Sequence, residues 1–70
     1  MSKLPSSRQV QQVLAAAGFV CVRQKGSHQR WSHDDGRRCT VVDAKKEVPL
    51  GTIRSIARQC QLPFSDFLNL

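Results

Sequence analysis

Hydrophobic positions near the N-terminus recur with the period of an α-helix. They are spaced i, i+3, i+4 and i+7, so they form one apolar stripe made by Val10, Val13, Leu14 and Ala17. Ser6 and Gln9 have the spacing of a capping box, and Gly18 is placed to end the helix. The pattern predicts a helix from Ser6 or Ser7 to Ala17.

A second helical stripe lies near the C-terminus and comprises Ile53, Ile56, Ala57 and Cys60. It predicts a helix from Leu50 or Gly51 to Cys60, which Pro63 prevents from extending further. Beyond the proline, a last short helical turn that caps the core is expected from Phe64, Phe67 and Leu68.

Between the two helices, three short runs favour β-strands, at residues 19–23, 28–33 and 37–42. Lys25-Gly26 supplies the first turn, and Asp34-Asp35-Gly36 is a strong signal for the second. Consecutive strands joined by such short turns form an antiparallel meander.

The predicted order is therefore α-β-β-β-α, an α+β fold with a three-stranded antiparallel sheet. Each helix has one apolar side, so both helices are expected to pack on the same face of the sheet. The other face is left to solvent, which antiparallel sheets tolerate. Seventy residues predict a single domain, 1–70, with residues 1–5 as an N-terminal tail.

Alternation along the second strand predicts which side chains point to the open face. Trp31 is the only tryptophan and is the expected core anchor, so side chains of opposite parity, His28, Arg30 and Ser32, point away from the core. In the third strand Arg38 and Thr40 share that face if Cys39 and Val41 point inward. The first strand shows no clean alternation.

Charge narrows the class of partner. Eleven Lys and Arg oppose five Asp and Glu, for a net charge of +6, and nine of the cations lie between Arg23 and Arg58. Such a basic surface favours nucleic acid through phosphate contacts and counterion release, although a solvated face that keeps the protein soluble is an alternative. A chain this short has no second lobe in which to build a cofactor cleft, and no cofactor is predicted.

The remaining composition predicts a cytoplasmic protein without a metal site. Cys21, Cys39 and Cys60 form no C-x-x-C pair, so we expect three small buried hydrophobes in a reducing compartment. A site built from His28, His33 and a cysteine lacks recognisable metal-ligand spacing. No segment resembles a signal peptide or a membrane span.

His28 is the candidate catalytic residue. Imidazole can take and give a proton near neutral pH, and here it follows a glycine turn among cations. RNA carries its own nucleophile, the 2′-hydroxyl, so one acid–base group and nearby cations suffice for phosphodiester cleavage. Lys25, Arg30 and Arg38 are the nearest candidates to hold the phosphate, and backbone N–H groups around Gly26-Ser27 could form an anion nest. The alternative is a surface histidine that only ends a turn.

Other polar residues favour structural roles. His33 adjoins the Asp34-Asp35-Gly36 turn and shares parity with Trp31, so a turn-capping or partly buried role is favoured over catalysis. Ser27 could be a nucleophile, but no orienting carboxylate is recognisable, and hydrogen bonding to backbone or phosphate is favoured.

Several segments, in order, resemble HicA-type toxins, also described as YcfA-like. The resemblance covers about Ser7 to Leu68 and is carried by Ala17-Gly18-Phe19, Arg23-Gln24-Lys25-Gly26-Ser27-His28, His33-Asp34-Asp35-Gly36-Arg37-Arg38 and Gly51-Thr52-Ile53-Arg54-Ser55-Ile56. It implies a double-stranded-RNA-binding-like fold and an mRNA interferase of a type II toxin–antitoxin pair.

The resemblance also implies site residues and a partner. The histidine after Gly-Ser in the family is catalytic, which here is His28, and a HicB-type antitoxin would mask it. From the residues themselves, and not from the resemblance, we expect RNA binding by Lys25, Gly26, Ser27, Arg30, Arg38, Lys45 and Lys46. Many members carry Pro-x-His after the third strand, where this chain has Val42-Asp43-Ala44, so a second histidine is lacking.

Two other functions share the fold and the charge. One is an RNA-binding module without catalysis, and the other is a subunit whose main ligand is an acidic antitoxin. Loss of cleavage with retained RNA binding in His28→Ala would favour the enzyme over the binding module. A salt titration bears on the antitoxin-binding subunit, because RNA binding should weaken steeply as salt rises.

Overall fold

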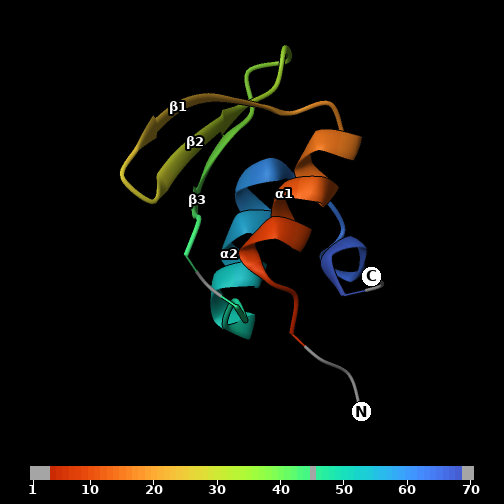
Figure 1. The fold of residues 1–70 in the computed structure, drawn as a ribbon. Coiled ribbons are helices and arrows are strands. Elements are labelled where there is room, and N and C mark those ends of the chain that lie inside the picture. Colours follow the sequence, from red (N-terminus) through yellow and green to blue (C-terminus); the bar gives the residue numbers. More distant parts are fainter. Residues whose placement is uncertain (1–3, 45, 69–70) are drawn as a thin grey trace.

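A computed structural model describes residues 4–44 and 46–68 of the chain. Figure 1 shows the elements in the order α-β-β-β-α, with a short 3₁₀ helix, η1, after the last α-helix. Their bounds are α1 Ser7–Ala16, β1 Val20–Lys25, β2 His28–Ser32, β3 Arg38–Val42, α2 Leu50–Cys60 and η1 Phe64–Phe67. The predicted α+β fold of the double-stranded-RNA-binding type is confirmed.

Helix α1 begins at the predicted capping box. The Gln9 backbone N–H donates to Ser6 Oγ at 3.2 Å, and the Ser6 N–H donates to Gln9 Oε1 at 2.9 Å, so both groups are satisfied. Gly18 follows the helix end with φ of +95°, a conformation that side-chain-bearing residues rarely adopt. Val10 and Leu14 are fully buried, as the stripe predicted.

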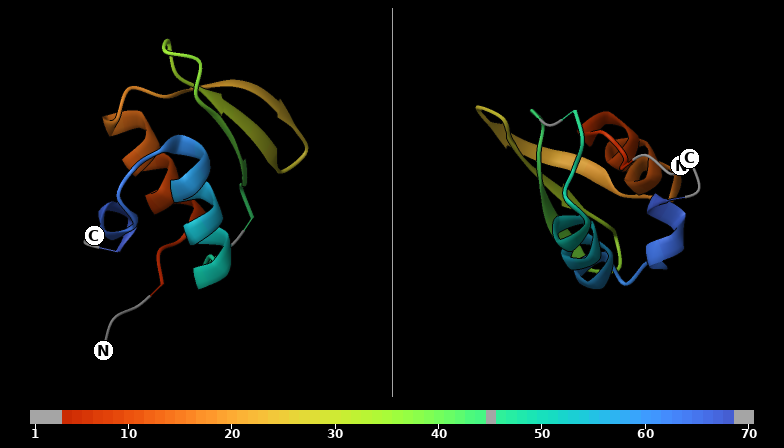
Figure 2. Two further views of the ribbon diagram at one scale, coloured as in Figure 1. Left: turned by 180° about the vertical axis from the view of Figure 1, so that it is seen from behind. Right: turned by 90° about the horizontal axis from the view of Figure 1, so that it is seen from below.

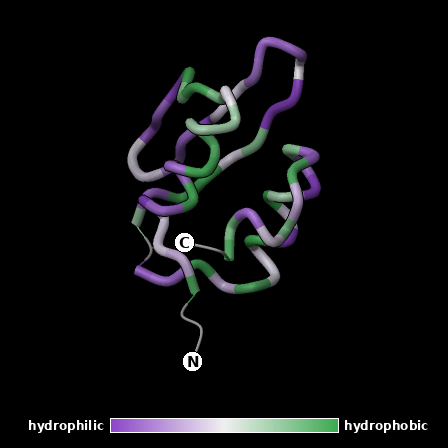
Figure 3. Tube along the Cα trace, turned by 90° about the vertical axis from the view of Figure 1, so that its right-hand side faces the viewer, coloured by the Kyte–Doolittle hydropathy of each residue, from purple (hydrophilic) through white to green (hydrophobic). Residues whose placement is uncertain are grey.

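Helix α2 buries all four members of its predicted stripe. Its C-cap is Gln61, a non-glycine residue in the left-handed conformation, with φ of 55°. Hydrophobic and hydrophilic residues alternate along the trace (Figure 3). The apolar sides of both helices face the same side of the sheet, which gives two layers with the core between them.

The sheet is antiparallel with strand order β1-β2-β3. In β2, Gln29 and Trp31 are buried while His28 and Arg30 are exposed; in β3, Cys39 and Val41 are buried. The predicted directions of these side chains are therefore confirmed. Gln29 is the exception to simple patterning, because it is a polar residue at a buried position.

Strand β1 differs most from prediction. Phe19 precedes the strand and is buried in the core, and the strand continues to Lys25, so that the turn is Gly26-Ser27 and not Lys25-Gly26. The register shifts between Cys21 and Arg23, which is a β-bulge and explains the lack of alternation.

All six residues of β1 are exposed, because the β1–β2 hairpin projects beyond the helices (Figure 2). The expectation of three buried cysteines is consequently wrong for Cys21, whereas Cys39 and Cys60 are buried.

Residues near both limits of the described chain also contact the core. Phe67 of η1 is fully buried, as predicted, but Leu68 is exposed. Of the predicted N-terminal tail, residues 1–3 lie outside the described part of the chain. Leu4 packs against the core, and the Pro5 carbonyl accepts a hydrogen bond from the Val48 N–H at 2.8 Å.

Candidate nucleic-acid interface

The open face of the sheet is the face that points away from α1 and α2. The strand register arranges its side chains in three rows across the strands, and each row takes one residue from each strand. The rows are Lys25–His28–Val42, Arg23–Arg30–Thr40 and Val20–Ser32–Arg38. We call them the first, second and third rows.

A shallow hollow of about 260 Å³ lies over the first two rows. It is lined by Arg23, Lys25, His28, Gln29, Arg30 and Thr40. The hollow therefore brings together His28 and the two nearest predicted phosphate-binding residues, Lys25 and Arg30. A second hollow between α1 and η1 holds no histidine or cation among its lining residues, Val13, Ala16, Ala17 and Asp66.

Other predicted RNA-binding residues lie outside the hollow. Arg38 is exposed in the third row, Gly26 and Ser27 form the turn before His28, and Lys46 is exposed in the loop after β3. Lys45 lies outside the described residues. The structure adds Arg23 and Thr40; Arg23 was missed because the predicted strand ended there, whereas β1 continues to Lys25 and brings Arg23 opposite Arg30.

No carboxylate among residues 4–44 and 46–68 forms an ion pair with a cation of the open face. In the described part of the chain the ion pair between permanently charged side chains is Arg37–Asp35, at the β2–β3 turn; His33 Nδ1 lies 3.1 Å from Asp35 Oδ1 and would form a second pair only if protonated. The open face therefore keeps a positive potential that attracts an anionic ligand.

The turn that precedes His28 is held by two hydrogen bonds. Gly26 has φ of +60°, and its carbonyl accepts from Gln24 Nε2 at 3.0 Å. The Ser27 carbonyl accepts from the Asp43 backbone N–H at 2.6 Å. Since His28 is the first residue of β2, these bonds fix the backbone from which its imidazole projects.

A polar network centred on the buried Gln29 lies beneath this turn, on the inner side of the sheet, and reaches the exposed Gln24 and Asp43. Gln29 Nε2 donates to Gln24 Oε1 at 3.3 Å and to Asp43 Oδ2 at 3.5 Å. Trp31 Nε1 donates to Gln29 Oε1 at 3.0 Å, and Gln11 Nε2 of α1 donates to Asp43 Oδ1 at 2.7 Å. Trp31 was predicted as a core residue, but the burial of Gln29 and its partners was missed; the available signal was a glutamine with the same strand parity as Trp31.

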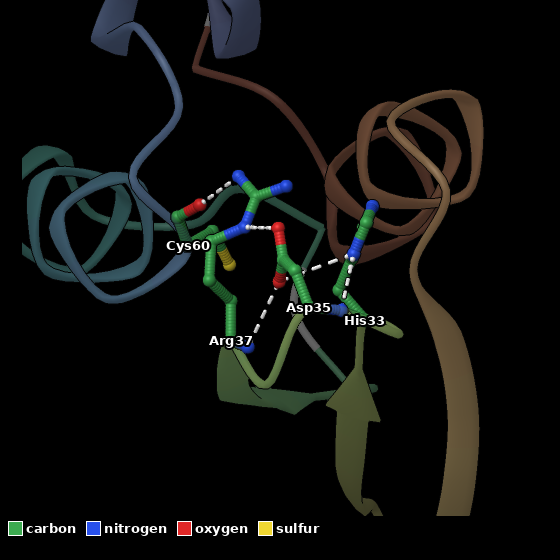
Figure 4. Close-up of polar contacts among 4 residues, drawn as sticks. All are labelled: His33, Asp35, Arg37 and Cys60. Carbon is green, nitrogen blue, oxygen red and sulfur yellow. Dashed lines mark hydrogen bonds and ion pairs between the residues drawn. The ribbon is translucent and has the colours of Figure 1, made fainter.

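His33 belongs to a separate cluster at the β2–β3 turn (Figure 4). Its Nδ1 accepts from the Asp35 N–H at 3.1 Å, and its ring packs edge-on against Phe19 with centroids 5.1 Å apart. The turn-capping, partly buried role predicted for His33 is confirmed.

Arg37 joins that turn to helix α2. Its Nε donates to Asp35 Oδ2 at 2.8 Å and its guanidinium donates to the Cys60 carbonyl at 2.7 Å (Figure 4). The side-chain hydrogen bond from Arg37, and after it the bond from its backbone N–H, holds the pKa of the Asp35 carboxyl below its ordinary value. His33 is thus engaged in structure, and His28 is the histidine left facing solvent.

The described residues hold neither a metal-ion cluster nor a membrane-spanning helix. They contain no group of three or more His, Cys, Asp or Glu side chains that could hold a metal ion. None of their helices has the length and apolarity that crossing a bilayer requires.

Comparison with known proteins supports one family. No curated protein matched the chain. The family model for the HicA toxin of bacterial toxin–antitoxin systems matches residues 7–62, which include both helices, all three strands and the hollow around His28. The chain therefore belongs to the HicA toxin family and is a toxin of a toxin–antitoxin system.

Proposed function

We propose that this toxin is an endoribonuclease that cleaves mRNA, with His28 as its general acid–base group and without a metal or cofactor. The observation that carries the proposal is the exposed imidazole of His28 in a hollow whose other lining residues include three cations without ion-pair partners in the described chain, Arg23, Lys25 and Arg30. A proton-transfer group and a cationic phosphate site are thereby adjacent.

The proposed reaction uses the nucleophile of the substrate. Neutral His28 takes the proton of a ribose 2′-hydroxyl, and O2′ attacks the adjacent phosphorus. The bond from phosphorus to O5′ breaks, and the leaving oxygen takes a proton from water. The products are a 2′,3′-cyclic phosphate and a 5′-hydroxyl end. Cations beside the phosphate stabilise the charge of the transition state, an effect comparable with that of acid–base catalysis itself.

The remaining contacts hold the substrate. Lys25 lies in the same row as His28 and serves the reacting phosphate, while the Gly26 and Ser27 N–H groups lie in the adjoining turn. Arg30 and Arg38 extend the cationic surface along the face, and Lys45 and Lys46 are the proposed contacts in the loop after β3.

His28 works as the only histidine of the proposed site. Val42 is its neighbour across the strands, and Asp43 and Ala44 follow it, where many relatives carry Pro-x-His. Asp43 is used in the network under the turn, so its carboxylate faces the inner side of the sheet.

We further propose that a HicB-type antitoxin inhibits the toxin by covering the open face. The net charge of +6 favours a partner with an acidic surface, and a protein laid on the first two rows would exclude RNA from His28.

The test compares the unmutated toxin with His28→Ala, using induced expression and purified RNA. We expect the unmutated protein to arrest growth and to produce 5′-hydroxyl ends, and the antitoxin to stop cleavage. His28→Ala should lose about 100- to 10,000-fold in cleavage rate while still binding RNA. The matched control is Arg58→Gln, an exposed cation on α2, and it should cleave normally.

Other outcomes favour other functions. RNA binding without cleavage by the unmutated protein would identify a binding module. Antitoxin binding without RNA binding and without RNA cleavage would identify an antitoxin-binding subunit. Growth arrest of equal strength by His28→Ala would remove His28 from the mechanism.

A further inference from the structure

Two arginines face each other directly across β1 and β2 in the second row. Arg23 pairs with Arg30, and Arg30 pairs with Thr40 on its other side. All three are exposed and line the hollow. Like charges directly opposite in a sheet are destabilising, and neither guanidinium has an ion-pair partner among residues 4–44 and 46–68. The second row therefore lacks an anion that would offset this repulsion.

The second row lies next to the first row, which contains His28, and strand geometry sets the distance between the two rows. Residues two apart along a strand are separated by about 6.7 Å. This distance is on the scale that separates successive phosphates in an extended polynucleotide. A phosphate held at Lys25 and His28 would thus place its neighbour over Arg23 and Arg30.

The open face offers phosphate contacts but no stacking platform. Every aromatic side chain of the chain lies in the core or packs against it: Phe19, Trp31, Phe64 and Phe67. Binding to single-stranded RNA by stacking needs exposed aromatic rings. Contacts on this face must therefore be made mainly to the backbone of the ligand.

We propose that Arg23, Arg30 and Thr40 form a second phosphate site, which binds the RNA phosphate next to the one at His28. The strand of RNA then runs along β1 and β2, with one phosphate in each row. The two guanidiniums and the Thr40 hydroxyl all donate to the phosphate oxygens. This inference rests on the proposed function, because it takes the ligand of the open face to be RNA.

The experiment measures binding of a short oligouridylate to the His28→Ala protein as a function of salt, so that cleavage does not interfere. Each phosphate contact contributes about 0.7 to the slope of log affinity against log salt for single strands. Adding Arg23→Gln should reduce the slope by up to about 0.7 and weaken binding roughly tenfold. Arg23→Lys should restore much of the slope but less of the affinity, because it keeps the charge and loses the planar fork.

The matched control is Arg58→Gln, which removes an equal charge from α2 and should leave slope and affinity unchanged. Thermal unfolding without RNA provides an independent readout. Arg23→Gln should not lower the melting temperature, because it relieves the repulsion with Arg30.

Three results would overturn the second phosphate site. RNA binding that is unaffected by Arg23→Gln would remove the site and leave the proposed nuclease standing. Equal losses for Arg23→Gln and Arg58→Gln would show an effect of net charge alone. No binding of the oligouridylate by any variant would overturn the proposed function together with the site.

Discussion

At the scale of the residue, Gln29 is a buried polar side chain that supports the turn before His28 through its hydrogen-bond partners. Both hydrogens of its amide nitrogen and its amide oxygen have partners, from Gln24, Asp43 and Trp31. Two of these partners also hold the carbonyls of the turn before His28. A buried network of this kind is stabilising only when each member is satisfied.

Gln29→Leu should destabilise the protein, because it leaves the Trp31 Nε1–H buried without an acceptor. A buried donor without a partner costs about 1 to 3 kcal/mol in the free energy of unfolding. Urea denaturation measures the change, and Gln12→Leu on the exposed side of α1 is the control, with an expected change within about 0.5 kcal/mol. Equal stability of Gln29→Leu and the unmutated protein would show that the network contributes nothing.

At the scale of the element, the β2–β3 turn is joined to helix α2 by one arginine. Asp35 accepts from the backbone and the side chain of Arg37, which in turn donates to the Cys60 carbonyl at the end of α2. Phe19 lies under this turn, with the Arg37 guanidinium 5.1 Å from its ring centroid. The turn therefore contributes to the position of the helix as well as to the hairpin.

Stability should depend on pH through Asp35. Its pKa is lowered in the folded state, so its contribution is present above the pKa of the unfolded chain and is lost as pH falls through the folded pKa. Asp35→Asn should melt below the unmutated protein at neutral pH, and the two melting temperatures should converge in acid.

The control for this measurement is Asp34→Asn at the neighbouring exposed position, where no ion pair occurs among the described residues. Its melting temperature should follow that of the unmutated protein at every pH. A constant difference between Asp35→Asn and the unmutated protein down to acid pH would contradict the role given to the carboxylate.

At the scale of the whole molecule, the exposure of the three cysteines shows which part of the sheet the helices cover. Cys39 of β3 and Cys60 of α2 are buried against each other between the layers, and a hydrogen bond to Cys60, together with burial, raises the pKa of the Cys39 thiol. Cys21 lies on the projecting hairpin and is exposed. One thiol is accessible in the folded state and two become accessible on unfolding.

Alkylation with iodoacetamide followed by mass spectrometry should give one rapid adduct at Cys21, whereas Cys39 and Cys60 should react only at the rate of global unfolding. In denaturant all three should react. Cys21→Ser should abolish the rapid adduct. Rapid labelling of Cys39 or Cys60 under native conditions would contradict a closed interface between β3 and α2.

The helices were predictable nearly to the residue, because an apolar stripe, a cap and a helix-ending residue are local signals that agree with the tertiary fold. The face of His28 was predictable for a similar reason, since Trp31 anchors the parity of β2. Strand β1 was not, because a bulge at Cys21–Arg23 and a hairpin that projects beyond the helices leave no alternation of buried and exposed residues along it.

The amino-acid sequence by itself determined the order of elements, the basic character of the molecule and the side of the sheet that carries His28. The order of elements and the side of the sheet depend on periodicity over a few residues, and the basic character depends on composition. Neither requires contacts between distant segments. Tertiary structure alone decided that Arg23 faces Arg30, that Gln29 supports the turn from beneath, and that Cys21 meets solvent. The first depends on strand register in the β1–β2 hairpin, the second on contacts of Gln29 with Gln24 and Asp43, and the third on how far the helices reach. All three are properties of packing between segments and are not expressed in local periodicity.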